Sequence, residues 1–427
     1  MQDVFAELSW RGLVHQTTDP NLGAWLREKP RTVYAGFDPT ADSLHVGHLV
    51  ALMTLRRFQK AGHRPIAVIG GATGMIGDPS GKSEERQLLS PETLQANIAG
   101  MAPQLRRFLD FECGSASALL LNNYDWIGPI SYLEFLRDVG KHTPVSVMLA
   151  KESVRTRLER SEGGLSYTEF SYMLLQAYDF VHLYQAYGCE LQIGGSDQWG
   201  NITAGIDLAR RLCGVQLYGL TCPLLTRSDG AKMGKTEAGA IWLSAQRTSP
   251  YQFYQYWINL PDADVGTCLR FFTDLETDAI EAALAEHQND PSRREGQKLL
   301  AGELTRLVHG EEALAAARRA SDILFGAEID HLTDAQLEAI FADVPSRPLS
   351  KTRLEGEGLW IVEALCEAGL AKTRSEARRL IAQGGVYLNN RRVDDMERRL
   401  GPQDLAGQTI LVLRTGKKNY ALLRFGE

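Results

Sequence analysis

The feature that most constrains the fold is an alternation of patterns between residue 33 and about residue 225. Five short runs rich in β-branched and other apolar residues alternate there with segments of helical periodicity. The runs are 33–37, 66–69, 118–122, 189–193 and 220–225. This alternation predicts a parallel sheet flanked by helices, which is an open α/β fold. Because ligands of such sheets bind at the carboxyl ends of the strands, the segments after these runs are the first candidates for a functional site.

The rest of the 427 residues predicts further domains, because a chain of this length exceeds one ordinary core. Residues 248–324 show helical periodicity with many aromatic side chains. A mixed segment with Pro345 and Pro348 follows and is typical of a linker, and short strands come after two further helical patterns. We therefore predict an α/β domain over 1–228, an α-helical domain over 229–325, a linker over 326–354 and a small α+β domain over 355–427.

Composition narrows the classes of function. No run approaches eighteen apolar residues, so no membrane span is expected. The first residues lack a signal-peptide pattern and the six cysteines contain no CxxC pair, which predicts a cytoplasmic protein with reduced thiols and no zinc site. The net charge of −7 opposes a general nucleic-acid binder, but residues 351–427 hold 14 Lys and Arg against 10 Asp and Glu. We therefore expect contact with a polyanion to be concentrated in those residues.

Two short segments suit phosphate binding. His45 and His48 flank Gly47 where a predicted strand leads into a helix, and N–H groups at a helix N-terminus favour anions. Far along the chain, Lys232 and Lys235 lie in a glycine-flanked loop that could approach the same anion. Taken singly, the first segment could be a chance arrangement and the second a solvated charged loop. Together they resemble the two ATP-binding signatures of class I aminoacyl-tRNA synthetases, HIGH and KMSKS, which predicts an ATP-consuming enzyme.

The glycine-rich segment 70–77 allows two rival interpretations, and both fail on spacing. It lacks the GxGxxG pattern of a dinucleotide loop, and Gly77 lies one residue too close to the following Gly-Lys-Ser for a P-loop. We instead predict a backbone cradle that presents Asp78, with Lys82 and Arg86 on the polar loop that follows.

A second glycine pair, Gly194 and Gly195, follows a predicted strand, so a nucleoside could approach the backbone there. Asp197 could then accept a hydrogen bond from a ribose hydroxyl. A plain turn is the alternative, and the apolar strand before it makes that alternative less attractive.

One helical segment carries a polar face. Tyr172, Gln176 and Asp179 are spaced i, i+4 and i+7, so they share one side of a helix. That side could simply face water. Alternatively, it forms the wall of a pocket for a small polar substrate, and the carboxylate would suit a substrate that donates a hydroxyl hydrogen.

With these motifs together, the chain resembles the bacterial-type tyrosyl-tRNA synthetases over essentially its whole length. Residues 37–44, 122–126 and 194–201 carry the resemblance, and residues 373–380 resemble part of an S4-type RNA-binding domain. The resemblance implies a Rossmann-like catalytic domain, an α-helical anticodon-side domain that begins with the lysine loop, and an S4-like domain. It also implies a homodimer with its interface near residues 125–165.

The resemblance also implies roles for single residues. Tyr34 and Asp179 would contact the phenol hydroxyl of tyrosine. The other residues that would hold the amino acid are Asp38, Asp78, Tyr172, Gln176 and Gln198. The catalytic contacts with ATP would come from Thr40, His45, His48, Lys82, Arg86, Lys232, Lys235 and Thr236. Further ATP-binding positions would be Gly36, Gly47, Gly195 and Asp197.

The implied reaction joins L-tyrosine to tRNA(Tyr) in two steps. The tyrosine carboxylate attacks the α-phosphorus of MgATP to give tyrosyl-adenylate and pyrophosphate, and the tyrosyl group then passes to the terminal ribose of the tRNA. Because the carboxylate is already a nucleophile at pH 7, positioning and charge stabilisation can supply the catalysis. Mg²⁺ is expected only as part of the ATP substrate, without a metal site of the protein itself.

Two alternatives stay open at this point. A tryptophanyl enzyme is the nearest relative, and Tyr34 with the segment 122–126 favours tyrosine. A non-catalytic RNA-binding protein on the same scaffold would carry the basic tail but would need neither phosphate motif.

Gly234 and Thr236 replace the serines of KMSKS, a departure at Gly234 that this subgroup tolerates.

Overall fold

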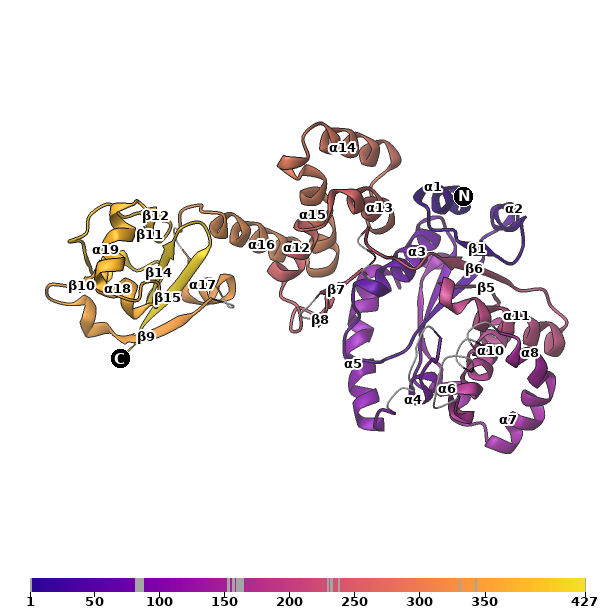
Figure 1. Ribbon diagram of the computed structural model, residues 1–427. Helices are drawn as coiled ribbons and strands as arrows, with labels where there is room; N and C mark the ends of the chain where they lie inside the picture. Colours follow the sequence, from indigo (N-terminus) through magenta and orange to yellow (C-terminus); the bar gives the residue numbers. More distant parts are fainter. Residues whose placement is uncertain are drawn as a thin grey trace. The chain divides into compact units, whose positions relative to one another are not determined.

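The structure is a computed structural model that describes the backbone of most of the chain. The described residues are 2–80, 88–151, 154, 155, 158, 165–228, 230, 233–236, 239–329, 332–341 and 344–426, with side chains left out at 235, 236 and 339. The chain divides into two compact units, Met1–Gly310 and Glu311–Glu427 (Figure 1). No helix in the described residues combines the length and the apolar character that a bilayer crossing requires.

A six-stranded sheet of order β1-β6-β5-β2-β3-β4 forms the centre of the first unit (Figure 1). Its strands are β1 (Gln16–Thr17), β2 (Thr32–Phe37), β3 (Arg64–Ile69), β4 (Leu119–Asn122), β5 (Cys189–Gly195) and β6 (Tyr218–Cys222). Strands β2 to β6 pair in parallel, and β1 runs antiparallel to β6. The predicted parallel sheet is therefore confirmed, and each predicted apolar run overlaps one of its strands.

The order of the strands places a crossing point at β2. This strand pairs with β3 on one side and with β5 on the other. The chain completes β3 and β4 first and then returns past β2 to form β5 and β6. In open α/β sheets, ligands bind outside the carboxyl ends of the strands at such a switch point. Tyr34 of β2 and Gln192 of β5 are register partners there.

Helices surround this sheet. They are α1 (Val4–Arg11), α2 (Leu22–Glu28), α3 (Leu49–Lys60), α4 (Thr73–Ile76), α5 (Pro91–Phe108), α6 (Tyr124–Ile127), α7 (Tyr132–Asp138), α8 (Val145–Leu149), α10 (Tyr167–Tyr187) and α11 (Trp199–Cys213). Helix α10 begins where the Ser166 side chain accepts the Glu169 N–H, and it ends at Gly188 in the left-handed conformation. Its Phe180 is buried in one cluster with Tyr34 and Ile66 of the sheet.

The remainder of the first unit is helical, as the periodicity predicted. A short hairpin of β7 (Lys235–Thr236) and β8 (Gly239–Ala240) precedes α12 (Pro250–Ile258), α13 (Asp262–Phe272), α14 (Thr277–Asn289) and α15 (Glu295–His309). The buried aromatic side chains of Phe253, Trp257 and Phe272 pack edge to face among these helices.

The second unit combines a five-stranded sheet of order β12-β11-β14-β15-β9 with short helices. The strands are β9 (Ser346–Ser350), β11 (Val386–Leu388), β12 (Arg391–Arg392), β14 (Ile410–Thr415) and β15 (Asn419–Gly426). A further pair is formed by β10 (Leu359–Trp360) and β13 (Arg399–Leu400). The helices are α16 (Glu311–Leu324), α17 (Asp334–Ile340), α18 (Ile361–Glu367) and α19 (Arg374–Ala382).

The prediction of a linker over 326–354 is wrong. Strand β9 pairs in parallel with β15, and α17 buries Leu337 in one cluster with Leu422 of β15. The prolines misled because β9 is an edge strand, where a residue without an N–H such as Pro348 is tolerated. Helix α16 also groups with the second unit, although we assigned it to the helical domain. The other predicted boundaries stay predictions.

Candidate active site

A chain of hydrogen bonds crosses the carboxyl ends of β2, β3 and β4. The hydroxyls of Thr73 and Tyr172 each donate to Asp38, at 2.8 Å to Oδ1 and 2.8 Å to Oδ2. Asn123 Nδ2 donates to Thr73 Oγ1 at 3.0 Å and to Asp179 Oδ2 at 3.0 Å. Three of the predicted substrate residues, Asp38 after β2 and Tyr172 and Asp179 of α10, are therefore held in one network.

Gly70 makes this network possible. A Cβ atom at this position would lie 2.0 Å from Asp38 Oδ1 and 2.3 Å from Thr73 Oγ1. Any larger residue would therefore displace the pair of side chains whose hydrogen bond starts the network.

A second network lies around Gln198 in the 3₁₀ turn η4 (Ser196–Gln198) that follows β5. Gln198 Nε2 donates to Asp78 Oδ2 at 2.7 Å, and Gln198 Oε1 accepts from Gln176 Nε2 at 3.3 Å and from Asn201 Nδ2 at 3.1 Å. The structure thus brings together Asp78, Gln176 and Gln198, to which the family resemblance assigned contacts with the amino acid. With the first network, they form a polar site on the carboxyl edge of the sheet.

Two buried polar atoms of this site have no hydrogen-bond partner among the described residues. They are the hydroxyl of Tyr34 and Oε1 of Gln176. Leaving a buried polar atom unpaired costs about 1–3 kcal/mol. Burial holds the pKa of the Tyr34 hydroxyl well above its usual value, so that hydroxyl keeps its proton and can donate it in a hydrogen bond. A ligand with its own polar groups would remove the cost.

Asp179 lies deep in the site and is held by two donors. Trp126 Nε1 donates to Oδ1 at 2.8 Å, and Asn123 donates to Oδ2. Burial raises the pKa of Asp179 to about 7, although these two hydrogen bonds lower it. Both Tyr172 and Asp179 are buried, so the polar face of α10 points into the protein and the alternative of a water-facing stripe is excluded for them.

The histidine segment forms a 3₁₀ turn, η1 (Val46–His48), before α3. The Gly47 N–H donates to His45 Nδ1 at 3.0 Å, and the His45 N–H donates to His48 Nδ1 at 3.0 Å. Burial and the neighbouring His45 lower the pKa of His48 to about 3, so this ring is neutral at pH 7. Because Nδ1 accepts in both rings, the proton of each neutral ring lies on Nε2, which is then a donor for a phosphate oxygen.

The second loop contacts this turn through its backbone. The Ile241 N–H donates to the Gly234 carbonyl at 2.8 Å, and the Val46 N–H donates to the Ile241 carbonyl at 3.0 Å. Gly234 has a φ of +78°, and a Cβ atom there would lie 2.7 Å from Cβ of Val46. Tyr256 of α12 secures the loop, because its hydroxyl accepts the Gly234 N–H at 2.8 Å. The two predicted phosphate segments therefore lie together.

The remaining predicted positions differ in what the structure describes. Gly36 and Thr40 are exposed, and Asp197 is half-buried beside Gly195. Lys82, Arg86 and Lys232 lie outside the described residues. Of Lys235 and Thr236 only the backbone is described, in β7. The roles predicted for these five side chains stay predictions.

Sequence reasoning missed three residues of the site: Thr73, Asn123 and Trp126. Asn123 joins Asp179 to Thr73, and its Oδ1 also accepts the Ala72 N–H at 2.7 Å. Its place directly after the predicted strand 118–122 was the signal that could have identified it. Trp126 lies in the segment that carried the family resemblance, but no role was assigned to it.

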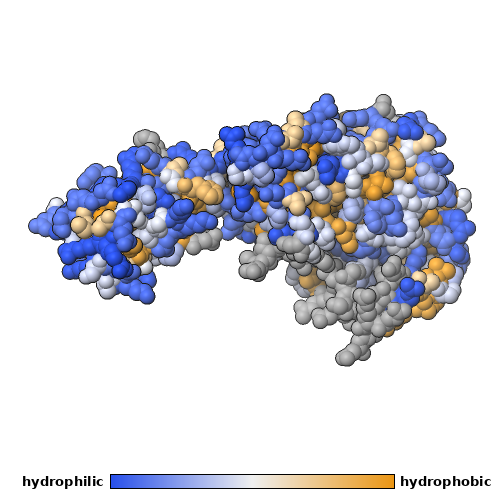
Figure 2. All heavy atoms as spheres, turned by 45° about the horizontal axis from the view of Figure 1, so that its top comes forward, coloured by the Kyte–Doolittle hydropathy of each residue, from blue (hydrophilic) through white to orange (hydrophobic). Residues whose placement is uncertain are grey.

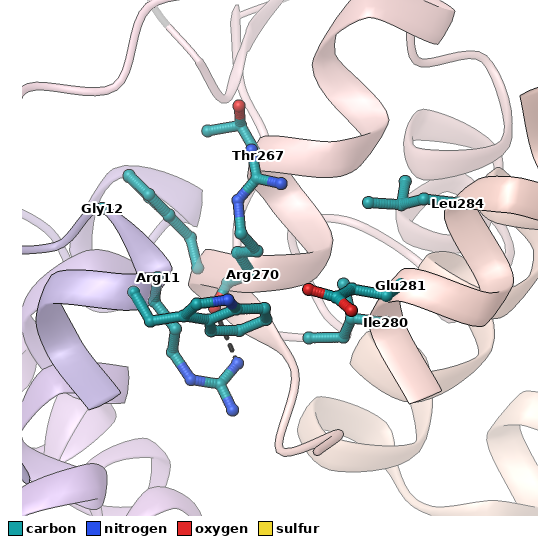
Figure 3. Close-up of a pocket in the computed structure, with 9 residues that line it drawn as sticks. Arg11, Gly12, Thr267, Arg270, Ile280, Glu281 and Leu284 are labelled. Carbon is teal, nitrogen blue, oxygen red and sulfur yellow. Dashed lines mark hydrogen bonds between the residues drawn. The ribbon is translucent and has the colours of Figure 1, made fainter. Parts of the chain in front are cut away.

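A cavity of about 470 Å³ lies elsewhere in the first unit, between α1, α13 and α14 (Figure 3). Figure 3 shows Arg270 and Glu281 lining it, with Arg11 donating a hydrogen bond of 2.9 Å to the Arg270 carbonyl. None of the predicted site residues lines this cavity. This cavity is therefore separate from the polar site on the sheet.

Two protein-family models match the chain. Residues 26–326 match the model described as tRNA synthetases class I (W and Y). Residues 336–423 match the model described as Tyrosine--tRNA ligase SYY-like C-terminal domain. The two matches cover both compact units.

Whole proteins and solved structures agree with these matches. A tyrosine–tRNA ligase of Rhodopirellula baltica is 62% identical over 422 residues, which are 99% of this chain and 96% of that protein. One of Geobacillus stearothermophilus is 53% identical over 425 residues, covering 99% and 100%. The structure of a C-terminally truncated mitochondrial tyrosyl-tRNA synthetase from Aspergillus nidulans is similar with a TM-score of 0.70, at 32% identity, over 76% of this chain and 95% of that one. The chain therefore belongs to the tyrosine–tRNA ligases of the class I tRNA synthetase family.

Proposed function

We propose that the polar site at the carboxyl edge of the sheet binds L-tyrosine and that the paired loops bind MgATP for its activation. The observation that carries this proposal is the pair of unpartnered atoms, the Tyr34 hydroxyl and Gln176 Oε1. A phenol hydroxyl could donate to Asp179 and accept from Tyr34 at the same time. It would thereby satisfy Tyr34, while phenylalanine would leave that hydroxyl unpaired.

The other end of the site suits the charged end of an amino acid. Asp78 supplies negative charge for the α-amino group, and Gln176 Oε1 supplies the acceptor that lacks a partner. Tyr172 stands beside them and is fixed by Asp38. Gln198, already an amide donor to Asp78, would lie near the substrate carboxylate.

ATP would lie between the two loops. The Nε2–H groups of His45 and His48 would donate to its phosphates, and Thr40 would assist them. From the facing side, the proposed donors are Lys82, Arg86, Lys232, Lys235 and Thr236. Gly36, Gly47, Gly195 and Asp197 would bind the nucleoside and allow its close approach. Mg²⁺ would enter with ATP as part of the substrate.

Catalysis then requires no general base. The tyrosine carboxylate oxygen forms a bond to the α-phosphorus while the bond to pyrophosphate breaks, and the cationic and N–H donors stabilise the charge on that leaving group. The ribose hydroxyl at the end of tRNA(Tyr) next attacks the tyrosyl carbonyl, and AMP leaves. The basic segment 351–427 of the second unit is proposed to hold the tRNA.

We also propose that the active form is a homodimer joined near α7 and α8. Leu133 is 76% exposed and Val145 is 59% exposed, with other large apolar side chains nearby in sequence. Figure 2 shows hydrophobic surface at the lower right, on the side where Figure 1 places α7. Sedimentation should give a dimer that Leu133→Lys weakens, whereas Leu88→Lys, at a site 66% exposed outside this segment, should leave it intact.

The six unpaired cysteines support the proposal of a cytoplasmic protein.

Amino-acid-dependent exchange between ATP and pyrophosphate tests the proposed function. We expect exchange with tyrosine and very little with phenylalanine. Exchange with tryptophan but not tyrosine would contradict the assignment of the pocket. Exchange with no amino acid would favour the non-catalytic RNA-binding alternative.

A further inference from the structure

The second unit carries a tryptophan whose ring is fixed at the surface. Trp360 ends β10, and its Nε1–H donates to the Met396 carbonyl at 2.7 Å. One part of the indole packs against the buried cluster that contains Leu365, and the side chain remains partly exposed. A single hydrogen bond and the packing thus set the plane of the ring before any partner arrives.

Three arginines lie over this ring in cation–π contacts. The guanidinium carbon of Arg378 lies 5.0 Å from the ring centre, and those of Arg374 and Arg399 lie 6.0 Å from it. They come from two elements, α19 and β13. Arg374 and Arg399 have carboxylate partners at 3.7 and 4.0 Å, but these pairs are solvent-exposed. Exposed pairs of this kind contribute little, so their guanidinium groups can exchange a carboxylate for a phosphate.

An indole ring with guanidinium groups over it offers the two kinds of contact that a single-stranded nucleotide can make. Every base has a flat face that can stack on an indole, and the adjoining phosphates can bind arginines in the bidentate mode. An apolar peptide partner would instead require an apolar groove beside the ring, whereas the groups that flank the ring here are charged. The surface therefore fits RNA with an unpaired base.

We propose that an unpaired base of the bound tRNA stacks on Trp360, while Arg374, Arg378 and Arg399 bind its flanking phosphates. This inference rests on the proposed function, in which the second unit holds the tRNA. It adds a contact to an unpaired nucleotide, distinct from general attraction by positive charge. Stacking and charge respond differently to salt, so the two contributions can be separated.

The test compares three variants by the affinity for labelled tRNA(Tyr) at several salt concentrations. Trp360→Leu retains apolar packing but lacks a flat π-face, and it should weaken binding about tenfold. Its slope of log affinity against log salt should match the wild type. Trp360→Phe loses the hydrogen bond to Met396 but retains stacking, so it should lie within about threefold of the wild type. Arg378→Gln should reduce the salt slope by about one unit.

Phe325→Ala is the matched control, because Phe325 is a 71% exposed aromatic residue of the same unit outside the arginine cluster. It should bind tRNA like the wild type. Tyrosine-dependent exchange uses no tRNA and should be unchanged in all these variants. Wild-type tRNA affinity in Trp360→Leu would overturn the inference, and so would equal losses in Trp360→Phe and Trp360→Leu, which would assign the effect to the Met396 hydrogen bond. If the wild-type protein showed no tyrosine-dependent exchange between ATP and pyrophosphate, that result would instead contradict the proposed function.

Discussion

The proposed tyrosine pocket and the proposed ATP loops are neighbours that are built in different ways. In the pocket, buried side chains bind one another, as Asn123 does when it joins Thr73 to Asp179. In the loops, distant backbone segments bind one another, as Val46 and Ile241 do. The pocket should therefore be sensitive to the chemistry of single side chains. The loops should be sensitive to backbone conformation.

The largest expected effect is on the pocket side of this comparison. Asp179→Asn should lower kcat/KM for tyrosine by about 10³-fold, because it removes the charged acceptor for the phenol hydroxyl. The KM for ATP should change by less than about threefold, since Asp179 belongs to the side-chain network. Steady-state exchange with each substrate varied in turn measures both values. If the kinetic parameters for ATP changed by the same factor as those for tyrosine, the pocket and the loops would not be separable.

On the loop side, Gly234→Ala should lower kcat for activation by roughly 50-fold while the Kd for tyrosine stays constant. The new Cβ would lie 2.7 Å from Val46 and would force the loops apart. Gly230→Ala is the control, because Gly230 also has a positive φ, +82°, but faces open space. Pre-steady-state adenylate formation measures kcat, and tyrosine binding is measured without ATP. Similar losses in both variants would attribute the effect to backbone strain alone.

The pH dependence should distinguish the two regions without any substitution. The pKa of Asp179 is raised to about 7, so the carboxyl is mostly protonated below pH 7 and ionised above it. The ionised form is the stronger acceptor for the phenol hydrogen, so kcat/KM for tyrosine should rise by up to about tenfold from pH 6 to pH 8. His48, with a pKa of about 3, stays neutral throughout and adds no titration in this range. A profile for Asp179→Asn that still rises would assign the titration to another group.

The smallest expected effect tests the link inside the pocket. Thr73→Val keeps the shape of the side chain but removes the hydroxyl that binds Asp38 and Asn123, and the KM for tyrosine should rise about fivefold. Thr54→Val is the control, because Thr54 is equally buried and its hydroxyl binds the Val50 carbonyl within α3. Tyrosine kinetics of both variants give the comparison. An identical rise in KM for both would reduce the network to a general contribution to stability.

The sequence predicted the parts of the site that follow from periodicity. The spacing of Tyr172, Gln176 and Asp179 required only a helix, and the strand runs required only local apolar composition. The sheet order and the contact between Val46 and Ile241 could not be predicted in this way, because they join segments far apart in the chain. The family resemblance, rather than any local pattern, supplied the expectation that the two loops share one ligand.

The misses have equally local causes. Asn123 looked like one polar residue after a strand, and its importance depends on three partners from other segments. The two residues of β1 are too few to give a strand pattern. Pro345 and Pro348 indicated a linker because their pattern does not show that β9 lies at a sheet edge.

The position of β15 between β14 and β9 has a consequence for synthesis on the ribosome. Strand β9 is made well before its partner, and the sheet of the second unit can close only after residues 419–426 have emerged. In the part of the first unit that the structure describes, the six-stranded sheet is complete by residue 222 and the last helix ends at residue 309. A nascent chain can therefore complete the part that would activate tyrosine while the part that would hold tRNA is still an open edge. Capture of the nucleic acid is then the last capacity that a newly made molecule acquires.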